Sequence, residues 1–216
     1  MTNNLFETQY DLTKKSKLRE FYDSYKIWIY SIILAIIIII GSYSYYNYSK
    51  EEKKILLSEN YIKAKVNLEN GNKDAAIKIL KDIIFSNDPS YSTLSFFMIL
   101  NENLINDRNE ISKLFDHLLE NNKFDKEIEN LLRYKKALFK SNYVDEENFL
   151  NEIRPLLNDK ETLWKGHGLM LVGDFYFSRK EYIKAKDFYS QILGIKNLQP
   201  ELYNQARMKL VNIAND

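Results

Sequence analysis

The feature that most constrains this chain of 216 residues is an uncharged apolar run near its N-terminus. Residues 27–46 read IWIYSIILAIIIIIGSYSYY, and no charged residue occurs between Lys26 and Lys50. At about 1.5 Å per residue, a helix of about 20 residues matches a hydrocarbon core of about 30 Å. A core helix of a soluble domain would carry a polar face, but the five consecutive isoleucines at 36–40 leave none. The sequence therefore predicts one transmembrane helix over residues 27–46.

The surroundings of this run indicate that it stays attached to the chain. Residues 1–26 form a polar leader, and the run is longer than the apolar core of a cleavable signal. Aromatic residues at both ends fit the headgroup level of a bilayer. Lys and Arg number five within 20 residues on each side, so charge bias assigns no orientation. A short leader before an uncleaved anchor usually stays in the cytoplasm, so we expect residues 47–216 to lie outside it.

Composition favours a helical domain that recognises its partners by shape. The net charge is only +1 with 28% charged residues, so no global field attracts nucleic acid. The absence of cysteine excludes disulfides, thiolate chemistry and Cys-ligated zinc. Six glycines and three prolines argue against a domain rich in sheet or loops. Helices are therefore the expected element after the apolar run.

From residue 51 onward, apolar residues recur at helical spacing between short polar segments. Asn70-Gly71-Asn72 predicts the end of one helix, and Asp88 followed by Pro89 predicts the start of another. That helix is expected to carry Leu94, Phe97, Leu100 and Leu104. Pro155, late in a helical pattern, predicts a kink or a break. Later helices are expected at 164–177, at 182–193 and from Pro200 onward.

An internal repeat relates two of these helix pairs. Four positions of the first match four of the second at a constant offset of 109 residues: Ala64, Gly71, Ala76 and Leu80 match Gly173, Lys180, Ala185 and Tyr189. This offset is close to three units of about 34 residues. At Leu169, Gly173, Tyr176, Ala185 and Tyr189 the chain resembles a tetratricopeptide repeat.

The chain also departs from the tetratricopeptide signature. Ile192 stands where a small residue is usual, the closing proline is displaced to Pro200, and the first copy has Asn67 in place of the tyrosine. The copies between Ser90 and Asp159 lose the signature. The resemblance implies an all-α fold, in which the transmembrane helix precedes a degenerate tetratricopeptide-like α-solenoid of antiparallel helix pairs over residues 47–216.

A polar leader, one uncleaved span and such a domain together resemble the YfgM-like ancillary subunits of the bacterial Sec translocon. The resemblance covers nearly the whole chain by architecture. It implies a single-pass protein of the bacterial inner membrane with a cytoplasmic leader, residues 1–26, and a periplasmic C-terminal domain. It also implies partners in the translocon and among periplasmic chaperones.

Residues that carry chemistry are sparse, so no enzyme, cofactor or metal site is predicted. Neither His117 nor His167 has a second histidine at metal-ligand spacing. Gly166 and Gly168 precede Gly173 in a weak likeness to a phosphate loop, but no predicted strand precedes them and the helical repeat explains Gly173 better. No nucleophile has an elbow motif.

Protein binding is the class of function that these residues favour, with neither a nucleic acid nor a small-molecule substrate. The resemblance to tetratricopeptide domains implies a groove lined by the first helix of each pair. Carried onto this chain, that groove comprises Tyr61, Lys65 and Leu68 in the first copy and His167, Met170, Asp174 and Phe177 in the last. The alternative is that Leu68, Met170 and Phe177 belong to the core of an irregular stack.

The resulting hypothesis is a membrane-anchored interaction scaffold, ancillary to the Sec translocon, that links export to periplasmic chaperones or envelope assembly. A second hypothesis is a scaffold of cell-envelope or division machinery unrelated to the translocon. A third, an envelope enzyme, would require a catalytic acid in a cleft, and the sequence offers no candidate.

Overall fold

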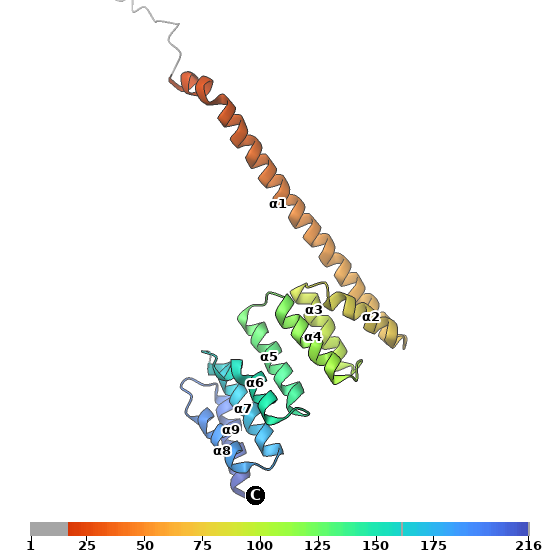
Figure 1. The fold of residues 1–216 in the computed structure, drawn as a ribbon, viewed down its shortest axis with the longest axis vertical. Coiled ribbons are helices and arrows are strands. Elements are labelled where there is room, and N and C mark those ends of the chain that lie inside the picture. The colour runs from red at the N-terminus through yellow and green to blue at the C-terminus, as the bar shows by residue number, and fades with distance from the viewer. Residues whose placement is uncertain (1–16, 161, 216) are drawn as a thin grey trace, which may run out of the picture. The chain divides into compact units, whose positions relative to one another are not determined.

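The computed structural model describes residues 17–160 and 162–215, and every regular element within them is a helix. A long helix, α1 (Lys17–Glu69), is followed by eight shorter ones (Figure 1): α2 (Lys73–Ile84), α3 (Pro89–Asn101), α4 (Arg108–Asn121), α5 (Lys126–Ser141), α6 (Glu146–Leu157), α7 (Thr162–Ser178), α8 (Tyr182–Leu193) and α9 (Pro200–Asn215). The expectation of an all-helical chain is thus confirmed for these residues.

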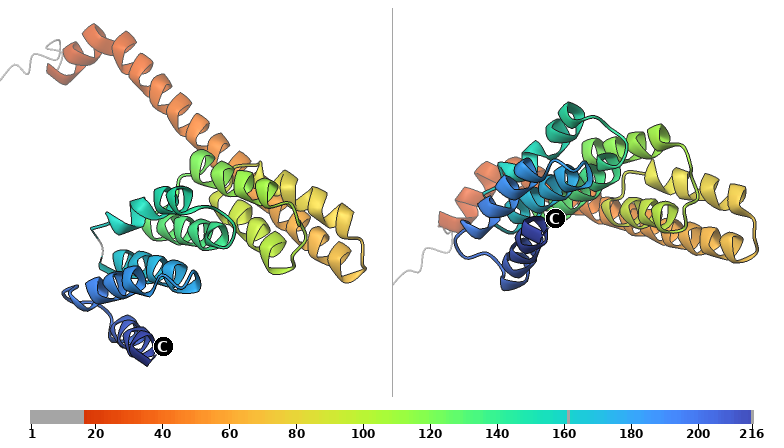
Figure 2. Two further views of the ribbon diagram at one scale, coloured as in Figure 1. Left: turned by 60° about the horizontal axis from the view of Figure 1, so that its bottom comes forward. Right: turned by 90° about the horizontal axis from the view of Figure 1, so that it is seen from below.

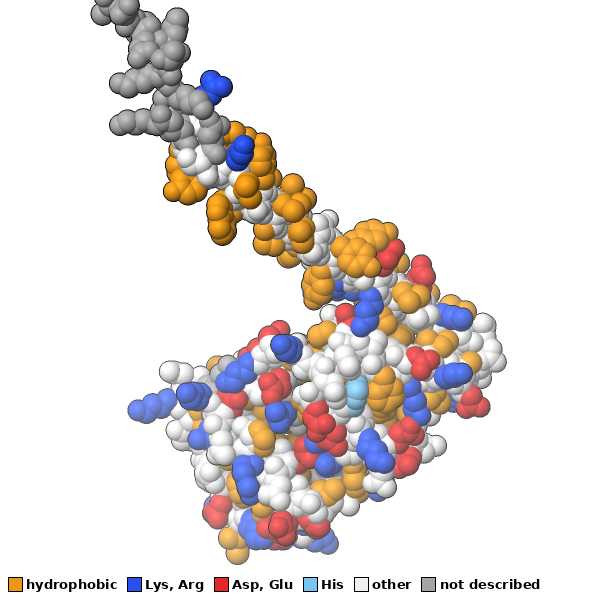
Figure 3. Space-filling model, turned by 45° about the horizontal axis from the view of Figure 1, so that its top comes forward, with side chains coloured by type: hydrophobic (Ala, Val, Ile, Leu, Met, Phe, Trp, Pro, Cys, Tyr) orange, Lys and Arg blue, Asp and Glu red, His pale blue; other side chains and the backbone are white. Residues whose placement is uncertain are grey.

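By its internal contacts the chain divides into an N-terminal unit, Met1–Leu56, and a C-terminal unit, Leu57–Asp216. In the N-terminal unit α1 carries the apolar run without interruption, and it is the one described helix long and apolar enough to cross a membrane. Ile36 to Ile40 are each 49–66% exposed, and Figure 3 shows many hydrophobic side chains along the long helix. Such a surface requires an apolar environment, which a membrane span or a signal sequence finds in lipid.

The end of α1 lies in the C-terminal unit, where a left-handed turn joins it to α2. Gly71 has φ +80°, a conformation in which a side chain is disfavoured. The amide of Asn72 donates to the carbonyl of Asn67 at 2.8 Å, and the amide of Gly71 donates to that of Leu68 at 3.0 Å. These two bonds satisfy carbonyls that the end of a helix leaves unpaired. The predicted helix end at Asn70-Gly71-Asn72 is confirmed.

The turn between α7 and α8 has the same backbone geometry, 109 residues later. Lys180 has φ +62°. Its amide donates to the carbonyl of Phe177 at 2.9 Å, and the amide of Glu181 donates to that of Tyr176 at 3.0 Å. The residues that precede the two following helices, Asn72 and Glu181, have φ, ψ of −82°, 63° and −88°, 63°.

Aspartates begin four of the other helices. Asp88 Oδ1 accepts the backbone amides of Ser90 and Tyr91 at 3.1 and 2.9 Å, so the predicted cap before Pro89 is confirmed. Helices α4, α5 and α6 are each capped by one aspartate whose carboxylate accepts a backbone amide: Asp107, Asp125 and Asp145, respectively. Each cap contributes about 1 kcal/mol by pairing an amide that the first helical turn leaves free.

The C-terminal unit is a succession of helices packed in chain order. From α2 to α9 each helix contacts the next, and further contacts join α5 to α7 and α7 to α9 (Figure 2). Buried apolar side chains form two clusters, one made by α1 to α4 with Leu132 of α5, the other made by α5 to α9. Helix α5 contributes to both clusters, so it connects the two halves of the unit.

The middle of the unit departs from a uniform repeat. The helices that open the four successive hairpins end at Glu69, Asn101, Ser141 and Ser178, so the intervals between them are unequal. Helix α6 continues through Pro155 to Leu157, so the proline does not break the helix. A proline in the last turn removes one backbone bond and still leaves the helix intact.

The buried face of α3 differs from the expected one. Leu94 is 48% exposed, whereas Ser92 and Ser95 are fully buried. The hydroxyl of Ser92 lies 3.1 and 3.0 Å from the carbonyl oxygens of Ile83 and Ile84 in α2, to which it donates. Ser92 lies inside because its hydroxyl bonds carbonyls at the end of the preceding helix, whereas the buried hydroxyl of Ser95 has no hydrogen-bond partner among the described residues.

Candidate protein-binding face

The four residues expected from the last copy of the repeat lie along α7, but not all of them reach its surface. His167, Asp174 and Phe177 are half-buried. Met170 is only 7% exposed and belongs to the apolar core of α5 to α9. Met170 therefore packs inside the stack, as the alternative interpretation expected for it, while the other three are accessible to a partner.

His167 lies in a small aromatic cluster between α5 and α7. The centroid of its ring is 5.7 Å from that of Tyr134 and 5.9 Å from that of Trp164. The indole nitrogen of Trp164 donates to Glu127 Oε2 of α5 at 2.9 Å, which fixes the ring between the two helices. Burial lowers the pKa of His167 below its ordinary value of 6.5, which favours the neutral imidazole.

Asp174 links three helices through its carboxylate. Its Oδ1 accepts the hydroxyl of Tyr189 in α8 and the ammonium of Lys209 in α9, both at 2.6 Å. Burial raises the pKa of Tyr189, and the hydrogen bond to Asp174 raises it further. Burial also raises the pKa of Tyr134, with a contribution from the charge of Asp174. This carboxylate is held by its neighbours and remains partly exposed.

Together these side chains define the α5–α7–α9 face, which comprises Tyr134, His167, Asp174, Phe177 and Lys209. Phe177 contributes an aromatic ring, with Lys209 Nζ at 6.0 Å from its centroid and the Tyr182 ring at 5.4 Å. The face combines apolar rings with a paired carboxylate and ammonium, and helix contacts hold α5, α7 and α9 side by side. Such a mixture suits a peptide or a partner helix better than a charged polymer.

The residues expected from the first copy lie in different surroundings. Tyr61 is half-buried, with its ring centroid 6.4 Å from that of Tyr91 in α3. Lys65 is exposed, and Leu68 is half-buried. Tyr61 packs against the apolar cluster of α1 to α4, whereas the α5–α7–α9 face borders the other cluster. The structure thus gives the two expected groups separate packing partners.

Sequence reasoning missed three residues near this face: Tyr134, Trp164 and Lys209. Tyr134 and Lys209 come from helices that flank α7, where no repeat signature gave a register. A weak sequence signal for these residues is that α5, α7 and α9 each contain aromatic and basic residues. Without a repeat signature to set the register, hydrophobic periodicity alone does not show which side of α5 or α9 packs against α7.

The glycines of α7 serve helix packing. A Cβ at Gly166 would lie 2.6 Å from Leu202 Cδ2, and one at Gly173 would overlap the ring of Tyr189. Both glycines are interior to α7, so the likeness to a phosphate loop is not accompanied by a loop. Within the described residues, no group of three or more His, Asp or Glu side chains is arranged to hold a metal ion.

Comparison of the chain with protein-family models, with curated proteins and with solved structures finds no match.

Proposed function

We propose that this protein is a membrane-anchored scaffold that binds other proteins through its C-terminal unit and catalyses no reaction. The observation that carries the proposal is the α5–α7–α9 face, where rings and a paired carboxylate are held by three helices. A partner that docks there gains apolar burial from the rings and polar contacts from their rim. In this proposal the helix pairs are a degenerate tetratricopeptide-like solenoid.

The proposed anchor is α1, with the leader in the cytoplasm and the C-terminal unit on the periplasmic side of a bacterial inner membrane. The exposed apolar surface of α1 supports membrane insertion. Tethering a binding unit to a membrane raises its effective concentration near membrane machinery without any new contact. A scaffold of modest affinity can act efficiently in this way.

The proposed site of action is the Sec translocon, where the scaffold links export to periplasmic chaperones or envelope assembly. The order of leader, apolar helix and helical hairpins supports this placement, because it resembles the YfgM-like ancillary subunits. The second candidate, a scaffold of cell-envelope or division machinery, rests on the same face and the same anchor. The two candidates differ only in the partner that the face selects.

Crosslinking of the tagged full chain in native membranes, followed by mass spectrometry, tests this proposal. We expect translocon subunits or periplasmic chaperones, whereas division proteins would support the second candidate. Lys209→Glu places a carboxylate beside Asp174 and should reduce partner recovery about tenfold, a loss of about 1.4 kcal/mol. The matched control is Lys186→Glu, on the exposed side of α8, which should leave recovery unchanged.

Three results would contradict the proposal. Equal recovery with Lys209→Glu and Lys186→Glu would remove the α5–α7–α9 face as the binding surface. Protection of the C-terminal unit from protease added to spheroplasts would reverse the orientation and exclude a periplasmic role. Substrate turnover by the purified full chain would exclude a function limited to binding.

A further inference from the structure

A cavity of about 500 Å³ lies among α4, α5 and α6, and none of the residues of the α5–α7–α9 face lines it. Its lining is mostly polar: Asn109, Ser112, Arg133, Lys140, Tyr143, Val144, Asn148, Asn151, Glu152 and Pro155. The volume falls within the range of sites that hold small ligands. Protein binding through the other face leaves this cavity unexplained.

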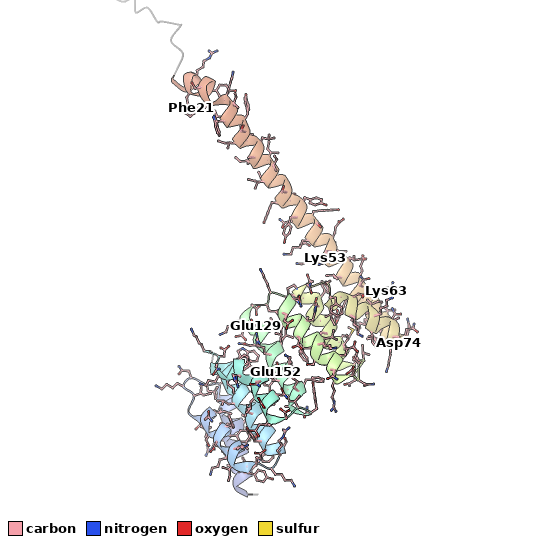
Figure 4. All side chains as sticks on the ribbon, viewed as in Figure 1. Phe21, Lys53, Lys63, Asp74, Glu129 and Glu152 are labelled. Atoms are coloured by element: carbon pink, nitrogen blue, oxygen red, sulfur yellow. The ribbon has the colours of Figure 1, made fainter. Side chains whose placement is uncertain are left out.

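Ion pairs hold the walls of the cavity in place. Lys136 of α5 is 8% exposed, and its Nζ lies 2.6 Å from both Asp116 Oδ1 of α4 and Glu152 Oε1 of α6. Lys140 Nζ lies 2.6 Å from the other oxygen of Glu152. Figure 4 labels Glu152 on α6 and Glu129 on α5. A nearly buried ammonium between two carboxylates fixes three helices, so the cavity is a built feature of the fold.

The polar groups of the cavity match a peptide backbone. Asn109 and Asn151 each carry an amide with both donor and acceptor atoms, as a peptide unit does, whereas Asn148 Nδ2 already donates to Asp145 Oδ2 at 2.9 Å. Pro155 has no amide proton, so the carbonyl of Asn151 lacks its helical hydrogen bond. Both residues line the cavity. An extended segment can donate an N–H to that carbonyl and pair with the side-chain amides. Acceptors of this kind disfavour a phosphate or another polyanion.

One cationic group of the lining is placed to meet an acidic side chain. Glu152, the carboxylate among the lining residues, is paired with Lys140, so Arg133 is the cation that a ligand carboxylate can reach. Arg133 donates through Nε and Nη2 to Glu129 Oε1 at 2.9 and 2.6 Å, and this pair orients the guanidinium. The remaining guanidinium nitrogen, Nη1, is suited to a ligand carboxylate.

We propose that this cavity binds an extended segment of a partner protein that carries one Asp or Glu. The proposal rests on the proposed scaffold function and adds a second contact surface with a defined ligand chemistry. The segment's backbone pairs with the asparagine amides and the carbonyl of Asn151, and its carboxylate bonds Arg133. One partner that occupies both surfaces is bound more tightly than either surface allows alone.

The first experiment is site-specific photocrosslinking with the full chain in native membranes. p-Benzoylphenylalanine replaces Ser112, which lines the cavity, or Lys113, its exposed neighbour on α4, which does not. We expect adducts at Ser112 that map to an extended segment with an acidic residue, and few at Lys113. Equal adducts at both positions, or a segment without Asp or Glu, would overturn the proposal.

The second experiment measures affinity with a synthetic peptide of the mapped segment and the full chain in nanodiscs. Asn109→Ala combined with Asn151→Ala should raise the Kd about tenfold, and replacing the peptide's carboxylate by its amide should do the same. The control, Asn204→Ala combined with Asn212→Ala on the exposed side of α9, should leave the Kd unchanged. Thermal unfolding of each variant checks that it folds.

These results separate failure of the cavity from failure of the scaffold. Partners recovered by whole-chain crosslinking but absent at Ser112 would reject the cavity and leave the scaffold intact. An unchanged Kd in the double asparagine variant would do the same. If the whole chain recovers no partner either, the scaffold is rejected and the cavity with it.

Discussion

Two hairpins of this protein, the end of α1 with α2 and α7 with α8, share one turn and close their interfaces with different side chains. In the first, Ala64 faces the cluster that contains Leu80, and both are fully buried. In the second, the equivalent positions are Gly173 and Tyr189, whose ring lies where a Cβ of the glycine would be. A small residue has become smaller as its partner has become larger, so the combined volume is preserved.

The exchange also changes the chemistry of the surface. Tyr189 has a hydroxyl, and that hydroxyl bonds Asp174, which in turn holds Lys209 of α9. Leu80 offers no such group to the first hairpin. The second hairpin therefore supports the polar part of the α5–α7–α9 face, while the first contributes apolar packing. Two hairpins with the same turn geometry can thus differ at their surface because of one buried residue.

Truncation of the buried residue should give the largest difference between the hairpins. Tyr189→Ala removes a fully buried ring and its hydrogen bond and should lower the free energy of unfolding by about 3–5 kcal/mol. Leu80→Ala removes fewer atoms and no hydrogen bond, so its cost, within about 2–5 kcal/mol for a buried leucine, should be smaller than that of Tyr189→Ala. Urea titration of the full chain in detergent micelles measures both. Tyr189→Phe is the control and should cost about 1–2 kcal/mol, since only the hydroxyl is lost. A larger cost at Leu80 would contradict the comparison.

The second-largest effect should come from replacing the small residue, Gly173. Gly173→Ala forces a methyl group into the Tyr189 ring and should cost about 1–3 kcal/mol. In a Tyr189→Leu background, which copies the first hairpin, the same change should be stabilising. A double-mutant cycle in the same urea titrations measures this reversal of sign. If the two changes are simply additive, the volumes at these positions are not coupled.

The shared turn should respond with opposite signs at its two copies. Gly71→Ala puts a side chain at φ +80° and should cost about 1 kcal/mol. Lys180→Gly removes a side chain from φ +62° and should stabilise by a few tenths of a kcal/mol. The larger freedom of glycine in the unfolded chain limits the gain. If both changes destabilise the protein, the two turns do not respond to a side chain at positive φ in the same way.

The smallest effect should be a pH dependence confined to the second hairpin, where His167 stands at the position of Ser58 in the first. Because burial lowers the pKa of His167, the unfolded chain takes up its proton first as pH falls. The stability is complete above pH 6.5, the ordinary value, and declines below it. In His167→Ser, the loss of melting temperature between pH 7.5 and pH 5.5, on either side of about 6.5, should shrink. If the variant loses as much melting temperature as the unmodified protein, titratable groups other than His167 cause the loss.

The sequence predicted the local features of this fold well. The end of α1 at Asn70-Gly71-Asn72 and the start of α3 at Asp88 and Pro89 follow from turn and cap chemistry within a few residues. The bounds of α8 agree with the prediction as well. Turn and cap residues predict structure well because they depend on local backbone conformation and not on a residue distant in the sequence.

Features that depend on two helices were predicted less well. Leu94 is exposed while Ser92 is buried, because the carbonyls at the end of α2 select a hydroxyl. Lys136 is buried between Asp116 and Glu152, although a lysine is normally expected on the surface. Burial alone lowers the pKa of Lys136, but the two carboxylates outweigh it and raise the pKa. No pattern along one helix reveals such a pairing.

The candidate sites show the same division. Asp174 and His167 were expected at a groove from the resemblance to tetratricopeptide domains. Tyr134 and Lys209 were not, since they reach the face only through the packing of α5 and α9 on α7. The cavity among α4, α5 and α6 has no sequence signature.

Sequence patterns alone were enough to predict an apolar helix near the N-terminus and the order of the helices from Lys73 onward. They did not show that the apolar helix continues without a break to Glu69. Hydrophobic period and backbone chemistry are local, so they can be read along the chain. The tertiary structure alone decided which side of each helix is buried, where Lys136 finds its carboxylates, and which side chains share a face. Those outcomes depend on the shape and charge of neighbouring helices, which no single segment contains.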